Sequence, residues 1–185
     1  MMPHKIDLLQ DMDMYEFFEA GIRGGMTFVN RHYAVKDENV DLLYVDVNNL
    51  YGGPLRGKLP SSNFQWVSDV ELRNICTNLP DDNADIGYLL EIDFVIPTEL
   101  HDKLSDLPPA PCSQKPPGSS VPKLLLTLEN KQNYIVLGSL LKFYIDKLGV
   151  RVTKVHRAIQ FQQSEIFSRY IEARASILKV SQGLL

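Results

Sequence analysis

The sequence has few cysteines and no long apolar run. Its two cysteines, Cys76 and Cys112, are too few and too far apart for a zinc ribbon or a framework of disulfides. No apolar stretch approaches the roughly 20 residues that a membrane-spanning helix needs. The first residues, MMPHKIDLLQDMDM, carry acids where a signal peptide has its apolar core. We therefore expect an intracellular, reduced protein that has no membrane partner.

Charge is distributed unevenly along the 185 residues. Residues 1–120 contain 9 Lys and Arg against 19 Asp and Glu, whereas residues 121–185 contain 10 against 4. A basic segment suits a polyanionic partner, because contacts with phosphates dominate the affinity of proteins for nucleic acids. Basic residues are also common on the solvated faces of helices, and charge alone favours that plainer interpretation. The residues that could line a DNA channel are Lys131, Lys142, Arg151, Lys154 and Arg157.

Apolar periodicity predicts the elements of the first half. Residues 8–20 place apolar side chains mostly on one helical face, and Gly21 is expected to end this helix. Residues 26–35 alternate apolar and polar side chains, which predicts a strand. Residues 42–47, LLYVDV, form a short apolar run that is typical of a buried strand. Residues 69–75 are expected to form a capped helix.

The second half mixes strands and helices around a Pro-rich loop. Pro97 closes the longest strand candidate, and residues 97–122 hold seven of the 11 Pro together with Gly118, which predicts a mobile loop or linker. Ser164 is a plausible N-cap for a last helix over 164–180. The remaining elements are strands over 86–97, 132–137 and 150–161 and a helix over 139–148 that Gly149 ends. Together they predict an α+β fold with a mixed or antiparallel sheet and packed helices.

Residues 42–60, LLYVDVNNLYGGPLRGKLP, nearly fit a phosphate-binding loop. Gly52, Gly57 and Lys58 satisfy the spacing G-x-x-x-x-G-K. The next residue is Leu59, where such a loop needs a Ser or Thr hydroxyl for magnesium. Pro60 follows, although a helix should begin there. The near match therefore does not predict a phosphate loop.

Asp46 allows three other interpretations. A calcium loop starting at Asp46 fails, because Leu50 and Tyr51 occupy the positions of the third oxygen ligand and the required glycine. Asp46 could instead cap the turn VNNLYG at the end of a strand, which is a common structural role. It could also be a metal-bound carboxylate for phosphoryl transfer, since magnesium prefers hard oxygen ligands and usually binds one or two carboxylates plus substrate phosphates. The last two interpretations remain open on these residues alone.

Other segments carry a resemblance to a known family. DVNNLYG (46–52) resembles motif A of the family B DNA polymerases, in the variant D-x-N-N-L-Y-G of the protein-primed branch of viruses, organelle plasmids and Polinton-type elements. FFEAGIRGGMTFVNRHYA resembles the junction between exonuclease and palm, whose signature is Y-x-G-G; here Ile22 replaces the Tyr. LPSSNFQWV and the segments beginning GYLLEIDF and KLLLTLEN resemble later palm-side segments. The resemblance covers about residues 8–172.

The resemblance implies roles for particular residues. Asp46 would coordinate the catalytic Mg²⁺ ions, and Val47 would add its backbone carbonyl. Tyr51, beside Leu50, would bind the incoming nucleotide and exclude a 2′-hydroxyl. Asn49 would lie near the template–primer end. Arg23, Gly24 and Gly25 match the junction motif that contacts the template strand. The plainer alternatives are that Tyr51 is a core aromatic and that the two glycines form a tight turn.

The resemblance also divides the chain into segments. Residues 1–25 resemble the end of the exonuclease–palm linker, and residues 26–66 resemble the palm segment with motif A. Residues 67–122 resemble an insertion with the Pro-rich loop, where this branch grips a priming protein. Residues 123–185 resemble a basic palm-side strand–helix–strand–helix segment that stops before the fingers.

Several parts of the family pattern are absent from the sequence. There is no D-T-D hairpin to complete the metal site, no fingers helix with its Lys and N-S-x-Y-G pattern, and no set of exonuclease carboxylates. A single carboxylate cannot hold two metal ions. We therefore expect a truncated piece of a DNA-directed DNA polymerase that is inactive alone, with DNA template–primer and dNTP as partners. The alternatives are a non-catalytic remnant that still binds DNA and an unrelated α+β interaction domain.

Overall fold

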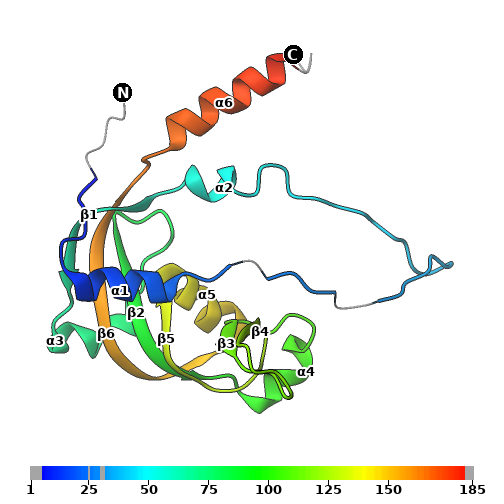
Figure 1. Cartoon of the computed structure of the whole chain (residues 1–185), viewed down its shortest axis with the longest axis horizontal. Helices are drawn as coiled ribbons and strands as arrows, with labels where there is room; N and C mark the ends of the chain where they lie inside the picture. Colours follow the sequence, from blue (N-terminus) through cyan, green and yellow to red (C-terminus); the bar gives the residue numbers. More distant parts are fainter. Residues whose placement is uncertain (1–5, 25, 30–31, 182–185) are drawn as a thin grey trace.

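Four antiparallel strands form the main sheet of the protein (Figure 1). The computed structural model describes residues 6–24, 26–29 and 32–181. The strand order is β1, β6, β2, β5, and every neighbouring pair is antiparallel. The strands are β1 (Leu59–Trp66), β2 (Ile86–Val95), β5 (Lys131–Leu137) and β6 (Arg151–Ser164). The predicted α+β class with an antiparallel sheet is confirmed.

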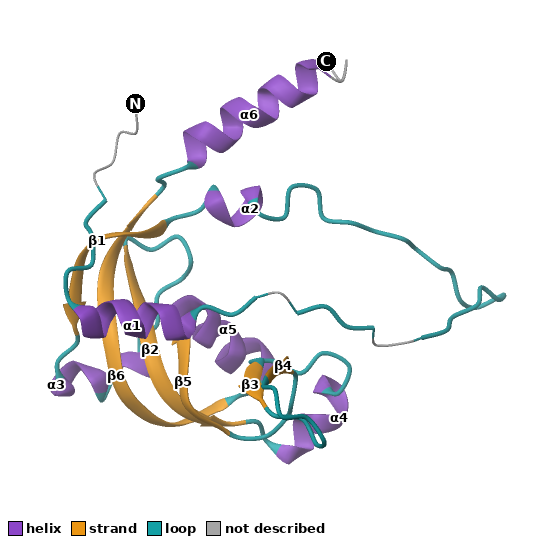
Figure 2. Cartoon of the chain, viewed as in Figure 1, coloured by secondary structure: helices purple, strands orange, loops and turns teal. Residues whose placement is uncertain are grey.

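Two irregularities bend β6, the longest of these strands. The register between β2 and β6 shifts twice, and it leaves Thr153 and His156 as extra residues with no partner on β2. A bulge of this kind increases the local twist of a strand. The sheet is accordingly curled rather than flat (Figure 2). The sequence predicted one regular alternating strand here, and its pattern gave no sign of the bulges.

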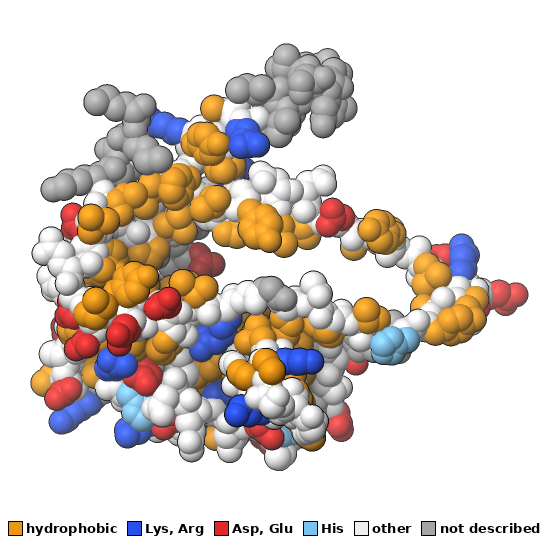
Figure 3. All heavy atoms as spheres, in the orientation of Figure 1, with side chains coloured by type: hydrophobic (Ala, Val, Ile, Leu, Met, Phe, Trp, Pro, Cys, Tyr) orange, Lys and Arg blue, Asp and Glu red, His pale blue; other side chains and the backbone are white. Residues whose placement is uncertain are grey.

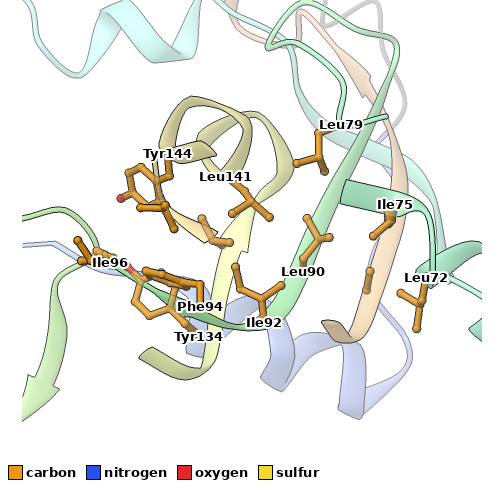
Figure 4. Close-up of a cluster of buried hydrophobic side chains, with 14 of the residues drawn as sticks. Leu72, Ile75, Leu79, Leu90, Ile92, Phe94, Ile96, Tyr134, Leu141 and Tyr144 are labelled. Atoms are coloured by element: carbon orange, nitrogen blue, oxygen red, sulfur yellow. The ribbon is translucent and has the colours of Figure 1, made fainter. Parts of the chain in front are cut away.

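Helices cover both faces of the sheet. On one face, α5 (Gly138–Leu148) packs Leu141 and Tyr144 near Leu90 and Ile92 of β2 (Figure 4). On the other face, α1 (Met12–Gly21) buries Phe17, which is only 1% exposed. Phe17 shares its cluster with Met14, Leu89, Ile135, Ile159 and Phe161. Burial on both faces explains why β2 is an almost continuous apolar run.

Local signals begin and end these helices. The side chain of Asp11 accepts a hydrogen bond from Asp13 N (2.9 Å) at the start of α1. A capping box of Ser68 and Glu71 begins α3 (Asp69–Leu72). Gly149 ends α5 with a left-handed φ of 71°. All three predicted helices are present, but α1 begins at Met12 rather than at residue 8, and α3 ends at Leu72 rather than at residue 75. The capping role of Asp11 was not predicted.

Short elements connect the larger ones. They are α2 (Gly52–Leu55), α4 (His101–Leu104) and two 3₁₀ turns at Ile75–Thr77 and Thr98–Leu100. Within the Pro-rich loop, β3 (Cys112–Gln114) pairs with β4 (Lys123–Leu125) as a separate two-stranded sheet. The predicted loop therefore contains a hairpin as well as irregular chain.

The predicted N-cap of the last helix is wrong. Ser164 is the last residue of β6, where it pairs with Leu59, and α6 (Ser168–Ser181) begins four residues later. Pairing with β1 extends the strand past the position at which the sequence suggested a helix start. Both positions are serines, so local preference alone did not separate them.

The predicted strands over 26–35 and 42–47 are also wrong for the residues that the structure describes. Residues 26–29 and 32–47 form no strand, and nearly all of them are exposed. Tyr44 is 97% exposed and Leu43 is 84% exposed. A β-strand needs a neighbouring strand for its backbone hydrogen bonds. The apolar run 42–47 has no such neighbour in the described part of the chain, so its pattern alone does not make it a strand.

Candidate functional site

The motif A residues lie on a long segment that leaves the body of the protein. This segment, residues 22–51, runs outward from the end of α1 and returns to α2 (Figure 1). At its tip Asp37 N donates to Val40 O (3.2 Å), and Lys36 pairs with Asp41 (2.8 Å). Apolar side chains are prominent along the segment (Figure 3). They include Phe28, Tyr33, Leu42, Leu43, Tyr44, Val45 and Val47, all of them exposed.

Asp46 presents an exposed carboxylate on this segment. Its Oδ1 accepts a hydrogen bond from Val47 N (2.9 Å), which is its own neighbour in sequence. The carboxylate is therefore free to accept a cation, and it does not cap the following turn. Among the residues that the structure describes, no group of three or more His, Cys, Asp and Glu side chains could hold a metal ion. Asp46 alone is thus an incomplete metal site.

Asn49 shapes the turn between Asp46 and α2. It has a left-handed φ of 55°, and its Oδ1 accepts a hydrogen bond from Gly52 N (3.2 Å). A Cβ at Gly52 would lie 2.1 Å from Asn49 Nδ2, so only glycine fits this turn without a shift. The capped turn weighed for Asp46 therefore exists, but Asn49 caps it. Asn49 was predicted to lie near DNA, and the fold already uses its side chain.

Leu50 and Tyr51 are exposed beside this turn. Tyr51 is 86% exposed and Leu50 is 61% exposed. The alternative of a buried core aromatic does not hold for Tyr51 in this structure. The ring stands free at the start of α2, where a ligand can reach it. The structure places Asp46, Leu50 and Tyr51 on one exposed segment but does not join them through any hydrogen bond.

Arg23 lies at the other end of the segment and is used by the fold. Its Nη1 donates to Ile135 O (2.6 Å) and to Gly21 O (3.1 Å), and its guanidinium lies over the ring of Tyr134. Gly24 is exposed, has no left-handed φ, and a Cβ there would meet nothing within 4 Å. Gly25 lies outside the described residues. The predicted DNA-contact motif therefore begins with an arginine that ties α1 to β5.

Most of the basic residues predicted to line a DNA channel are paired within the protein. Lys131 is only 4% exposed, and its Nζ donates to Thr127 Oγ1 (2.6 Å) and Thr127 O (3.0 Å). Lys154 makes no ion pair among the described residues. The other three pair with acids of the first 120 residues: Lys142 with Asp81, Arg151 with Glu99 and Arg157 with Glu91. Three of the ten basic residues of 121–185 are thus paired with acids of the first 120 residues.

His156 was expected to be structural, and it contacts an acid. Its Nε2 lies 2.8 Å from Asp93 Oδ1, which also accepts a hydrogen bond from Asn133 N (2.8 Å). The hydrogen bond from Asn133 and the contact with His156 hold the pKa of Asp93 below its ordinary value. The bulge at His156 turns it toward Asp93. Sequence alternation gave no signal for this pair.

Lys58, part of the near match to a phosphate loop, has a structural role. Its Nζ donates to Asp85 Oδ1 (2.6 Å) and to Asn83 O (2.8 Å). The residue after it begins β1 rather than a helix, so the geometry of a phosphate loop is absent here. Sequence reasoning missed that Lys58 holds the loop that precedes β2. The signal would have been Asp85, but it lies 27 residues along the chain from Lys58.

Comparison with known proteins places the chain in a family. The model of the family "DNA polymerase type B, organellar and viral" matches residues 4–182. No curated protein and no solved structure matches the chain. No helix within residues 6–24, 26–29 and 32–181 is long and apolar enough to cross a membrane. The family match covers nearly all residues, including the motif A segment and the sheet. The chain therefore belongs to the organellar and viral type B DNA polymerases.

Proposed function

We propose that this chain is a palm-region piece of a DNA-directed DNA polymerase and that Asp46 is one of its metal ligands. The observation that carries the proposal is the exposed Asp46 carboxylate within D-V-N-N-L-Y-G, in a chain matched to the family over residues 4–182. Its hydrogen bond comes from the adjacent backbone, and no side chain within the described ranges competes with a cation for it. DNA template–primer and dNTP are the substrates that the family implies.

The neighbouring residues have roles in the same proposal. Val47 offers a backbone carbonyl next to the Asp46 carboxylate. Leu50 and Tyr51 contact the incoming nucleotide, and the ring of Tyr51 excludes a 2′-hydroxyl by sterics. The exposure of both side chains supports this role. Asn49 acts near the primer end mainly by holding the turn that presents Tyr51.

Arg23, Gly24 and Gly25 are proposed to lie along the template strand. Glycines permit a close approach of backbone amides to phosphates. Arg23 holds the start of the segment in position rather than binding DNA through Nη1, because Nη1 already donates to Ile135 O and Gly21 O. The Pro-rich loop between Pro97 and Pro122 is the proposed contact for a priming protein. Its support is its position in the family order.

The described residues do not form a magnesium site by themselves. Type B polymerases use divalent metal ions, and magnesium prefers six oxygen ligands in octahedral geometry. Asp46 supplies one carboxylate, and the described residues contain no group of three or more His, Cys, Asp and Glu side chains that could hold a metal ion. The other ligands must come from substrate phosphates and from carboxylates outside the described residues. The chain alone is accordingly proposed to be inactive in primer extension.

The test measures binding of Mn²⁺ in the presence of template–primer and dNTP, with the relaxation of water protons as the readout. We expect Asp46→Asn to weaken Mn²⁺ binding, and Glu38→Gln, which changes an exposed acid of the same segment, to leave it unchanged. Equal Mn²⁺ binding by wild type and Asp46→Asn contradicts the ligand role. Primer extension by the wild-type chain alone contradicts the proposed inactivity.

A non-catalytic nucleic-acid-binding role is the second candidate. The observation that favours it is the lack of any acid cluster fit for a metal among residues 6–24, 26–29 and 32–181. In that case DNA binding persists in Asp46→Asn and does not depend on divalent metal. Absence of DNA binding even at low salt supports instead an α+β interaction domain, because phosphate contacts strengthen as salt falls.

A further inference from the structure

A cavity of about 390 Å³ lies close to the motif A segment. It opens between the turn after α2, the loop 80–83 and the first residues of α5. Small-molecule sites in proteins typically have volumes of roughly 300–1,000 Å³. Pro54 and Gly57, which lie three and six residues after Tyr51 in sequence, belong to its wall. None of the family roles described above uses this cavity.

The loop that forms one wall is held in place from three sides. Lys58 reaches it from the turn after α2, Lys142 from α5 and Gln163 from the end of β6. Each contact joins the loop to a different element, so the wall is fixed before any ligand binds. The contacts are Lys58 Nζ to Asp85 Oδ1 (2.6 Å) and Asn83 O (2.8 Å), Lys142 Nζ to Asp81 Oδ1 (2.6 Å) and Gln163 Nε2 to Ala84 O (3.0 Å).

The lining combines an apolar wall with a few polar groups. The apolar part consists of Leu59, Pro60, Pro80, Tyr88, Leu137 and Phe161. Three polar groups that line it make no hydrogen bond with any described residue: the Ser139 hydroxyl, the Asn83 side-chain amide and Gln163 Oε1. Together they offer both donors and acceptors. This combination suits a flat ring with a polar edge.

The charges at the cavity argue against a phosphate group. Lys58 is neutralised by Asp85, and the nearby Asp81 is neutralised by Lys142. Asp82 also lines the cavity and has no ion pair among the described residues. No unpaired cation is therefore left to bind an anion. Ser139 and Gln163 are half-buried and Asn83 is exposed, and an aliphatic or phenyl side chain of a partner protein would offer these three polar groups no hydrogen bond.

We propose that this cavity binds one unpaired nucleobase of a single-stranded nucleic acid. The base lies against the apolar wall and turns its polar edge toward Ser139, Asn83 and Gln163, while the sugar–phosphate backbone passes over α2. The inference rests on the proposed function in one respect, that the substrate of the chain is DNA. It does not depend on Asp46 or on a metal ion.

The test is fluorescence anisotropy of a labelled oligothymidylate and of an abasic oligomer of the same length at low salt. We expect the wild-type chain to bind the base-bearing strand more tightly, by about tenfold or more, as stacking energies for single bases imply. Ser139→Trp fills the cavity and removes this difference. Leu140→Trp, on an exposed neighbour outside the lining, keeps it. Asn83→Ala, which adds no bulk, weakens base-dependent binding if Ser139→Trp proves unstable.

Three results overturn the proposal. Equal binding of the abasic strand shows that the backbone alone is bound. If neither thymidine nor oligothymidylate binds, a nucleobase is not the ligand of the cavity. If N-acetyl-tyrosinamide binds the wild type but not Ser139→Trp, and oligothymidylate does not displace it, the cavity belongs to a protein partner. Asp46→Asn is expected to bind oligothymidylate like the wild type without metal. A failure of the metal role therefore stays distinguishable from a failure of the base pocket.

Discussion

The guanidinium of Arg23 lies over the ring of Tyr134, with its central carbon 3.9 Å from the ring centroid. The same side chain donates to Ile135 O, so it binds both the ring and the backbone of β5. Arg23 lies two residues after the end of α1, at the start of the segment that carries Asp46. Its contacts therefore fix the point at which that segment leaves the sheet. An arginine predicted to contact DNA is thus also an anchor of the fold.

Arg23→Ala is expected to lower the free energy of unfolding by about 2 kcal/mol. The change removes a charged hydrogen bond to a buried carbonyl and a cation–π contact. Arg23→Lys should recover less than half of the loss, because an ammonium cannot donate to both carbonyls while stacking on the ring. Urea denaturation measures both changes. Arg73→Ala, at an exposed arginine without an ion pair in the described ranges, is the control, and equal stabilities of the Arg23 and Arg73 variants contradict the anchor role.

The stability of the protein should depend on Asp93 at acid pH. Its pKa is lowered in the folded protein, first by the hydrogen bond from Asn133 N and then by His156. A carboxyl with a lowered folded pKa stabilises the protein above its ordinary value, 3.8 here, and this contribution is lost as pH falls through the lowered value. Asp93→Asn should therefore reduce stability at neutral pH and flatten its fall below pH 3.8. Thermal unfolding at a series of pH values measures this.

The matched control for Asp93 is Asp106→Asn, an exposed acid with no hydrogen bond to the described residues. The stability of this variant should fall at acid pH in the same way as that of the wild type. Parallel pH profiles for wild type and Asp93→Asn are incompatible with the proposed role of the Asn133 and His156 contacts. A flatter profile in both variants points to general charge repulsion instead.

Buried Lys131 should make Thr127 important for stability. Lys131 is 4% exposed, its ammonium has no carboxylate partner in the described part of the chain, and Thr127 supplies two of its acceptors. Thr127→Val keeps the shape but removes the hydroxyl acceptor, which should cost about 1–3 kcal/mol. In a Lys131→Met background the same change should cost little, since no ammonium remains to be satisfied. Chemical denaturation of the four proteins in this cycle measures the coupling, and additive effects contradict it.

Local signals in the sequence predicted several elements correctly. Helix ends depend on residues within one turn, and the Ser68–Glu71 capping box and Gly149 were therefore visible in sequence. Strands depend on partners far along the chain. The run 42–47 has the residues of a buried strand, yet no described strand lies beside it. Ser164 looked like a helix cap because its pairing with Leu59 cannot be seen locally.

The candidate site shows the same contrast between local signals and partners that lie far along the chain. The motif names candidate residues, such as Asp46 and Tyr51, from residue type and spacing, and their roles stay predictions. The partners of charged residues were not predictable, since Arg157 meets Glu91 and Lys58 meets Asp85 only after the sheet has formed. The predicted DNA-contact surface of residues 121–185 shrinks for that reason. The bulges at Thr153 and His156, which aim a histidine at Asp93, likewise depend on the register with β2.

Gly87 should be intolerant of a side chain, because it lies opposite Phe161 across β2 and β6. A Cβ at Gly87 would lie 2.4 Å from Phe161 Cε2 and 2.7 Å from Gln163 Cδ, and both neighbours line the proposed base pocket. Gly87→Ala should therefore destabilise the protein by about 1–3 kcal/mol through overpacking. Phe161→Leu should reduce that penalty, since a smaller side chain frees the space above Gly87. Thermal and urea unfolding of both single variants and the double variant measure the coupling; a Gly87→Ala protein as stable as the wild type contradicts the close packing of this pair.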